Sequence, residues 1–196
     1  MRLRLVLFSV LLLLPCVVAA AETAKHPVRV QTVQADFEQE KHLKILLHPV
    51  RSSGRFVFQA PGSLRWEYIH PFHSVLLLHD GQVKKFVEHD GQLRQDRTSG
   101  FDAMGVILGE ISGWLEGKFT DTPTFTVQPS GKGNPVLIPR DPGMRGFIQQ
   151  IVLEPGDRPG LLKSVTIVEG ADSFTRMIFS NPVLNRPVDR ALFTEP

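Results

Sequence analysis

Hydrophobic and polar residues alternate through residues 33–89, and this period of two predicts β-strands. The pattern predicts strands at residues 37–41, 53–58, 64–68, 75–78 and 83–87. Asp80-Gly81 and Asp90-Gly91 follow two of these runs and are typical of tight hairpin turns. Short strands joined by such turns indicate an antiparallel sheet.

The alternation also predicts which side chains share a face of this sheet. Large apolar residues of two consecutive strands fall on one face: Phe56, Phe58, Leu64, Trp66 and Tyr68. Arg65 and Glu67 alternate with these residues and point to the opposite face, so we expect that face to be exposed to solvent. A sheet with one apolar face must curl around something or be covered by another element.

The cover is expected from residues 101–119, where apolar residues recur at spacings of three and four. They are Phe101, Met104, Ile107, Leu108, Ile111, Trp114, Leu115 and Phe119. This period predicts an amphipathic helix over residues 101–119. Glycine occupies every fourth position of the segment: Gly105, Gly109, Gly113 and Gly117. We interpret these glycines as a bare strip that allows close packing.

Each glycine costs a helix about 1 kcal/mol relative to alanine, so this helix is marginal on its own. A marginal helix suits a movable lid, whereas the same apolar spacing also suits a tightly packed core helix. The sequence favours neither interpretation over the other.

The C-terminal half predicts further strands, at residues 124–127, 136–138, 147–153, 161–168 and 173–179. Turn signals at residues 154–160 and 170–172 separate the last three. The chain shows no internal repeat, linker or domain boundary. We therefore expect one α+β domain built on a single curved antiparallel sheet with few helices.

The first 21 residues have the three parts of a secretory signal peptide. Arg2 and Arg4 precede a short apolar run, and three alanines end the segment, which suits cleavage after Ala21. The apolar run is too short for a comfortable membrane span. We expect a signal peptide at residues 1–21 and a single domain at residues 22–196.

The formal net charge of +2 arises from 22 basic and 20 acidic residues. Arg2 and Arg4 account for this excess, so the chain beyond the signal peptide is neutral. A neutral chain lacks the basic surface that holds a phosphate backbone, which argues against nucleic acid as a partner.

Cys16 is the single cysteine, and it lies inside the predicted signal peptide. Lipidation at Cys16 is an alternative, but Pro15 stands where lipoprotein signals have a small residue, so we favour cleavage after Ala21. The rest of the chain then carries no thiol. Such a chain suits an oxidising compartment, and the bacterial periplasm fits best.

The sequence lacks the motifs of nucleophilic catalysis and phosphate binding. Three histidines flank the predicted strand at residues 75–78: His70, His73 and His79. Their spacing matches no zinc pattern, so exposed strand-end histidines are favoured over a metal site. Asp80 and Asp90 lie in turn signals, which disfavours a catalytic pair. We predict no enzymatic activity and no cofactor.

Phenylalanine dominates the aromatic residues, with 13 Phe against two Trp and one Tyr. Most of the aromatic surface therefore has no polar group. The apolar sheet face and the helix could enclose an ordinary core, or a cavity for an apolar ligand, because the same residue types line both.

Four short motifs follow one another in the first half of the chain: F-x-Q at Phe37, G-x-F at Gly54, P-x-x-L-x-W at Pro61 and D-G at Asp80. A closing segment lies at residues 188–193. In this order, and behind a signal peptide, they resemble the outer-membrane lipoprotein carrier family, LolA and its relatives.

The resemblance implies an incomplete, strongly curved antiparallel half-barrel with a helical lid over a hydrophobic cavity. It implies a monomeric periplasmic carrier that shields the acyl chains of lipoproteins, or of similar acylated lipids, between the inner and outer membranes. The implied partners are the acylated cargo, an inner-membrane export complex and an outer-membrane receptor. The alternative is a periplasmic binding or assembly module with a filled core.

The implied ligand-binding residues combine the apolar sheet face with the helix: Phe56, Phe58, Leu64, Trp66, Tyr68, Met104, Ile107, Leu108, Ile111 and Leu115. Two departures from the family pattern stand out. Ala60 precedes Pro61, where well-known carriers have an arginine that holds the lid shut. Residues 43–49 are apolar where the family has a polar loop; we favour an extension of the first strand over an exposed loop that touches a membrane or a partner.

Overall fold

The fold is described here from a computed structural model that covers residues 30–196 except 98–102, 116, 132 and 159. Within these residues the chain forms eleven strands, one α-helix and two short 3-10 turns. The predicted signal peptide at residues 1–21 lies outside the described residues.

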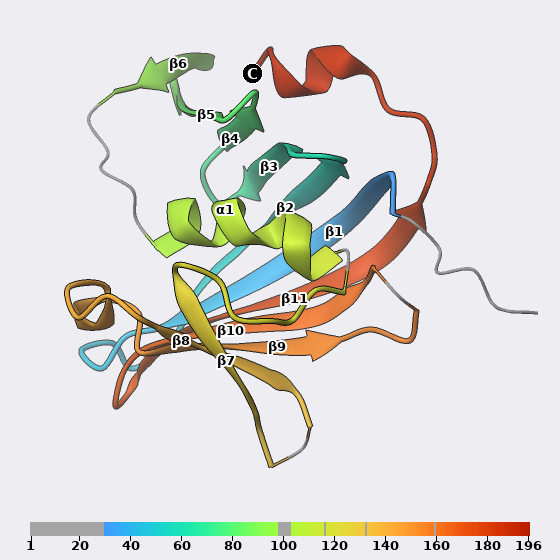
Figure 1. The fold of residues 1–196 in the computed structure, drawn as a ribbon. Helices are drawn as coiled ribbons and strands as arrows, with labels where there is room; N and C mark the ends of the chain where they lie inside the picture. Colours follow the sequence, from blue (N-terminus) through green and yellow to red (C-terminus); the bar gives the residue numbers. More distant parts are fainter. Residues whose placement is uncertain (1–29, 98–102, 116, 132, 159) are drawn as a thin grey trace, which may run out of the picture.

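All eleven strands belong to one antiparallel sheet. In chain order they are β1 (Thr32–His42), β2 (Val50–Gln59), β3 (Ser63–His70), β4 (Ser74–His79), β5 (Gln82–His89), β6 (Gln92–Asp96), β7 (Phe125–Pro129), β8 (Pro135–Pro139), β9 (Gln150–Pro155), β10 (Leu162–Gly170) and β11 (Ser173–Leu184). Their order across the sheet is β6-β5-β4-β3-β2-β1-β11-β10-β9-β8-β7. The predicted curved antiparallel sheet is confirmed, and β6 and β7 remain its two edges (Figure 1).

The two halves of the chain meet in the middle of the sheet. β1 pairs with β2 on one side and with β11 on the other, so Phe37 lies between Gly54 and Phe179. Gly54 is required by this pairing, because a Cβ atom there would overlap the backbone carbonyl oxygen of Glu67 on β3. This close approach of two backbones explains the glycine of the G-x-F motif.

Helix α1 (Ala103–Leu115) lies against the concave face of the sheet (Figure 1). Its buried side chains, Leu108, Ile111, Trp114 and Leu115, join the main core together with residues of β1, β2, β3 and β11. The predicted cover is thus a helix, but it is shorter than the predicted range of 101–119. Phe101 lies outside the described residues.

Gly117 ends the helix earlier than the sequence pattern suggests. It has a φ of +73° and donates its N–H to the Trp114 carbonyl at 2.9 Å, while Lys118 N–H donates to the Gly113 carbonyl at 2.8 Å. These two hydrogen bonds form a Schellman cap, which needs a left-handed residue that glycine supplies without strain. Phe119 therefore follows the helix and packs against the core from the connection beyond it.

The interpretation of the glycines as a strip for close packing is wrong at Gly109 and Gly113. A Cβ atom at Gly109 would have no neighbour within 4 Å, and one at Gly113 would meet only the Lys118 carbonyl oxygen at 3.9 Å. Gly109 lies on the exposed side of α1. These glycines weaken the helix without any compensating contact.

The expectation that the opposite face of the sheet is exposed to solvent is wrong around Arg65. The C-terminal turn η2 (Arg190–Phe193) covers that face of β3 and β4. Phe193, Val75 and Leu77 are buried there, outside the main core, and Arg65 is buried beside them. Parity within one strand could not reveal a cover that comes from a distant segment.

The apolar stretch at residues 43–49 is not an extension of the first strand, contrary to the favoured prediction. β1 ends at His42, and the Leu46 N–H donates to the Leu43 carbonyl at 2.9 Å in a turn. Ile45 is 88% exposed and Leu47 is 97% exposed. The alternative of an exposed apolar loop is the one that the fold adopts.

The remaining boundaries differ from the predictions by a few residues. β6 (Gln92–Asp96) was not predicted, although the turn before it was. The strand expected at residues 147–153 begins only at Gln150, because the 3-10 turn η1 (Met144–Gly146) occupies the preceding residues. In the described part of the chain, helices fall short of the length and apolarity that a membrane crossing demands.

Candidate functional site

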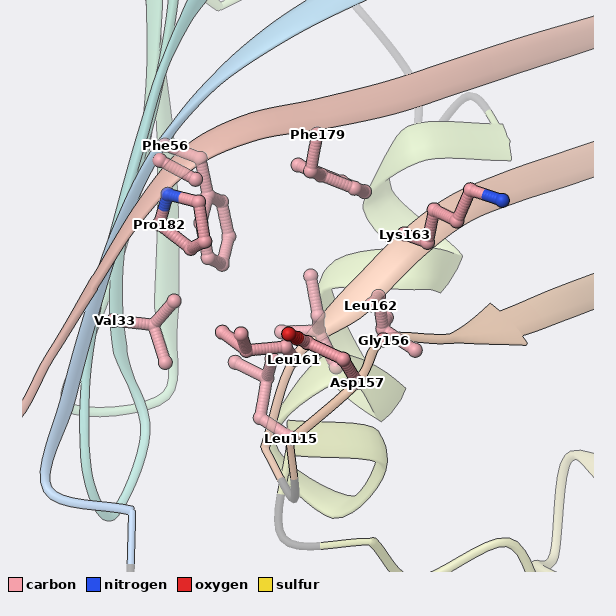
Figure 2. A pocket seen from close by; sticks show the side chains of 12 residues that line it. Val33, Phe56, Leu115, Gly156, Asp157, Leu161, Leu162, Lys163, Phe179 and Pro182 are labelled. Atoms are coloured by element: carbon pink, nitrogen blue, oxygen red, sulfur yellow. The ribbon is translucent and has the colours of Figure 1, made fainter.

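A pocket of about 220 Å³ lies between α1 and the sheet. Apolar side chains from four elements form most of its wall: Val33 and Ala35 on β1, Phe56 on β2, Phe179 on β11, and Ile111 and Leu115 on α1. Figure 2 shows Val33 and Phe56 facing Leu115 and Leu161 across the open space.

The pattern of side-chain sizes on β1 creates the space. Val33, Ala35 and Phe37 alternate on the concave face, and Ala35 pairs with Phe56 on β2. Alanine between two larger residues leaves a gap that its neighbours do not fill. The pocket therefore opens over Ala35.

The loop between β9 and β10 closes one side of the pocket. The Gly156 N–H donates to the Leu161 carbonyl at 2.9 Å, and the side chains of Leu161 and Leu162 line the pocket. Gly160 has a φ of +83°, and a Cβ atom there would overlap Val30 and lie 3.0 Å from the Leu115 carbonyl oxygen. Glycine at this position therefore lets the loop approach the end of α1.

Charged groups lie only at the rim among the pocket-lining residues. Asp157 and Lys163 are both largely exposed, and Lys163 Nζ lies 2.8 Å from Glu154 Oε1. Ser164 Oγ donates to the other Glu154 oxygen at 2.9 Å. Hydrogen bonds from Lys163 and Ser164 lower the pKa of Glu154 below its ordinary value. The Lys163 ammonium is thus already paired, and the interior of the pocket is apolar.

Three of the ten residues implied by the resemblance line this pocket: Phe56, Ile111 and Leu115. Four others are fully buried in the adjoining core: Phe58, Leu64, Trp66 and Leu108. Tyr68 is partly buried against that core and donates its hydroxyl to Gln39 Oε1 at 2.9 Å. The side chains of Met104 and Ile107 lie outside the part of the chain that is described.

Sequence reasoning missed most of the β1, β11 and loop contributions: Val33, Ala35, Leu161, Leu162, Phe179 and Pro182. The strand pattern of residues 173–179 placed Phe179 in a strand and could have predicted that its side chain faces the core. The pairing of β1 with β11, which brings that strand to the pocket, had no signal in the local pattern.

A separate polar cluster lies near the end of β3, away from the pocket-lining residues. His73 Nε2 lies 2.9 Å from Glu67 Oε1, and His73 Nδ1 lies 3.1 Å from Glu88 Oε2. Burial alone would raise the pKa of Glu67, but hydrogen bonds and charge from Arg65 and His73 hold this pKa below its ordinary value. The cluster joins β3 to β5 through His73, which lies in the connection between β3 and β4.

The other polar residues singled out from the sequence have local structural roles. His79 Nδ1 lies 2.8 Å from Ser63 Oγ, which links β4 to β3. Asp80 and Asp90 have φ of 48° and 53° in the two hairpin turns, as the D-G signals predicted. Within the described ranges, no group of three His, Cys, Asp or Glu residues is arranged to hold a metal ion.

Comparisons with known proteins identify what the chain resembles. The family model "Outer membrane lipoprotein carrier protein LolA" matches residues 28–98, which include β1 to β6 and the four motifs. A comparison with curated proteins found no match.

Solved structures give weak similarities over most of the chain. A DUF1329 family protein from Desulfovibrio piger is 9% identical, with a TM-score of 0.47 over 84% of this chain and 90% of that one. A LolA superfamily protein from Nitrosomonas europaea is 12% identical, with a TM-score of 0.42 over 86% and 92%.

The Pseudomonas aeruginosa MucA/MucB complex contains a chain that is 15% identical, with a TM-score of 0.39 over 82% of this chain and 54% of that one. The family-model match covers the stretch in which the motifs were recognised, and it bears out that recognition. Residues 28–98 are thus similar to the outer-membrane lipoprotein carrier family.

Proposed function

We propose that this protein is a non-enzymatic carrier that shields the acyl chains of lipoproteins, or of similar acylated lipids, during transfer between the inner and outer membranes. The observation that carries the proposal is the apolar pocket of about 220 Å³ between α1 and the sheet. The resemblance of residues 28–98 to the lipoprotein carrier family agrees with it.

The energetics of acyl chains explain why burial suffices for this task. Exposing an acyl chain to water costs about 0.8 kcal/mol for each CH₂ group. A carrier lowers that cost by covering the chain, and no bond needs to be made or broken. An apolar interior with charges only at its rim fits this requirement.

The size of the pocket implies that the carrier opens to accept its cargo. Ligand pockets for small molecules usually measure about 300–1,000 Å³. At about 220 Å³, this pocket accommodates part of one acyl chain in the closed form. Larger cargo requires α1 to move away from the sheet.

Helix α1 is suited to such a movement. It has 13 residues and contains Gly105, Gly109 and Gly113, so its intrinsic stability is low. Its attachment rests mainly on a few buried side chains, including Ile111 and Leu115. The sheet has its own continuous hydrogen bonding, so α1 can detach while the sheet remains folded.

The exposed loop at residues 43–49 supplies a contact with a membrane surface in this proposal. Ile45, Leu46 and Leu47 are consecutive exposed apolar residues, and an exposed apolar patch is typical of a surface that meets a membrane or another protein. The register of β2 and β3 places Phe72, which is 79% exposed, in a turn at the same end of the sheet. The export complex and receptor implied by the resemblance are the expected partners.

We also propose how the chain is organised and where it works. Residues 1–21 act as a cleaved signal peptide, residues 22–196 form one carrier domain, and the protein works as a monomer in the periplasm. The competing function is a periplasmic binding or assembly module whose core is filled in the working state.

A substitution that fills the pocket distinguishes the carrier function from the competing one. Ala35→Leu places a larger side chain in the pocket, and Ala171→Leu makes the same change in an exposed turn. We expect Ala35→Leu to weaken binding of a dansyl-labelled fatty acid at least tenfold, while Ala171→Leu binds as the wild type does. If no protein binds the probe, or if both variants bind it equally, the carrier proposal is wrong.

A further inference from the structure

Trp66 carries a buried polar atom that the surrounding protein leaves unpaired. Its side chain is 1% exposed, and its indole Nε1–H has no acceptor among the residues that the structure describes. The large majority of buried polar groups in proteins are hydrogen-bonded, because an unpaired donor has lost its bond to water without replacement. This N–H therefore needs an explanation.

Aromatic rings surround the Trp66 indole. The ring centroids of Phe37, Phe56 and Phe179 lie 4.8, 5.4 and 6.0 Å from that of Trp66. These rings offer no conventional acceptor, so the indole N–H sits in an apolar environment. A polar atom of a ligand that reached this position would find a donor ready to bond.

Two of these rings also form the wall of the pocket. Phe56 and Phe179 line the pocket and also pack against Trp66. Figure 2 shows both rings bordering the open space. Phe56 is 2% exposed whereas Phe179 is only partly buried, so Phe179 is the ring with more freedom to move.

We propose that Trp66 Nε1–H is the polar point of the ligand site and donates a hydrogen bond to a neutral carbonyl of the acylated cargo. This inference rests on the proposed carrier function and specifies the ligand class within it. The hydrocarbon chain fills the pocket over Ala35, and its ester or amide carbonyl lies beside Trp66 after Phe179 has moved.

The chemistry of the surroundings selects a neutral carbonyl over other groups. A plain hydrocarbon leaves the N–H unpaired. A carboxylate would pair with it but would bring an unbalanced charge into a cluster of phenylalanines, which is unfavourable. An ester or amide carbonyl satisfies the donor without burying a charge, and acyl conjugates carry such a group at the head of every chain.

Matched ligands and matched variants test this inference. Methyl laurate carries an ester carbonyl, and tetradecane has the same chain length without one. Trp66→Phe removes the N–H and keeps an aromatic ring, while Trp114→Phe makes the same change at the other tryptophan, which does not line the pocket. Affinities are measured by displacement of a dansyl-labelled fatty acid.

We expect the wild type and Trp114→Phe to prefer the ester by about three- to tenfold, the range that one neutral hydrogen bond provides. In Trp66→Phe the two ligands should bind with similar affinity. An unchanged ester preference in Trp66→Phe would overturn the role of the N–H while leaving the carrier function intact. Failure of every protein to bind either ligand would instead overturn the carrier function.

A spectroscopic measurement keeps the inference testable if Trp66→Phe does not fold. The Trp114→Phe variant labelled with ¹⁵N-tryptophan has a single indole N–H signal, that of Trp66. Methyl laurate should move the proton of this signal downfield, as hydrogen bonding to an oxygen does, and tetradecane should not. Identical spectra with the two ligands would contradict the proposed bond.

Discussion

The Arg65 guanidinium donates a hydrogen bond to the backbone carbonyl of Glu195 at 2.8 Å, which joins β3 to the C-terminal end of the chain. The orientation of the guanidinium is fixed further, because its Nε–H also donates to Glu67 Oε2 at 3.0 Å. Phe193 is buried beneath this contact. The curved sheet therefore has a second small core on its outer face, held by the C-terminal turn.

This outer core should contribute measurably to stability. Phe193→Ala is expected to lower the free energy of unfolding by about 3–5 kcal/mol, because it removes a fully buried ring. Phe72→Ala makes the same change at an exposed site and should alter stability by less than about 0.5 kcal/mol. Urea denaturation measures both. Equal effects of the two substitutions would show that the C-terminal turn is not held as described.

Acidification should weaken the cluster around Glu67. Its pKa in the folded protein lies below the ordinary value of 4.5, so the carboxylate stabilises the fold above that value. This contribution is lost as the pH falls through the folded pKa, since the unfolded state takes up the proton first. Glu67→Gln should therefore be less stable than the wild type near neutrality, with a smaller further loss on acidification below pH 4.5.

Urea midpoints measured between neutral and acidic pH test this expectation. Glu154 has a lowered pKa for similar reasons, so part of the acid sensitivity should persist in Glu67→Gln. If the two proteins lose stability in parallel over the whole range, Glu67 does not contribute as described.

Alanine substitutions in α1 should separate a lid from a fixed core helix. Gly109→Ala is expected to stabilise the protein by about 1 kcal/mol, because its Cβ atom meets nothing within 4 Å. If α1 must loosen to release cargo, release of a bound fatty acid should slow about fivefold. Stopped-flow displacement of a dansyl-labelled fatty acid measures this rate.

Gly117→Ala provides the matched control for that prediction. Its φ of +73° is unfavourable for alanine, so this substitution should destabilise the helix and speed release. If neither substitution changes the release rate, the cargo enters and leaves without movement of α1.

The loop at residues 43–49 should govern contact with membranes. Ile45→Ser and Leu47→Ser are expected to weaken co-sedimentation with phospholipid vesicles without changing the melting temperature, because both side chains are almost fully exposed. Ile178→Ser makes the same change at a partly exposed position on β11 and should leave vesicle binding intact. Equal vesicle binding by all these proteins would rule out the loop as the contact.

The sequence predicted features that depend on short-range patterns. The hairpin turns at Asp80-Gly81 and Asp90-Gly91, and the shared face of Phe56 and Trp66, follow from the period of two and from turn chemistry. The D-G turns require residues that tolerate a positive φ, so their residue types are strongly restricted. Such features are readable without knowledge of the tertiary fold.

Features that depend on distant partners could not be read in this way. The cover over Arg65 comes from residues 127 and 130 positions later in the chain, and nothing in β3 signals it. The pairing of β1 with β11 brings Phe179 to the pocket for the same kind of reason. Residues 43–49 were misjudged because an apolar run looks the same in a buried strand and in an exposed loop.

Native mass spectrometry of the protein, purified under mild conditions from the cells that produce it, tests the carrier function most directly. The account predicts that a fraction of the protein carries the additional mass of an acylated lipid or lipopeptide, and that Ala35→Leu loses this species while Ala171→Leu retains it. A wild-type protein that is always free of acyl species, and that binds none when it is offered, would contradict the account.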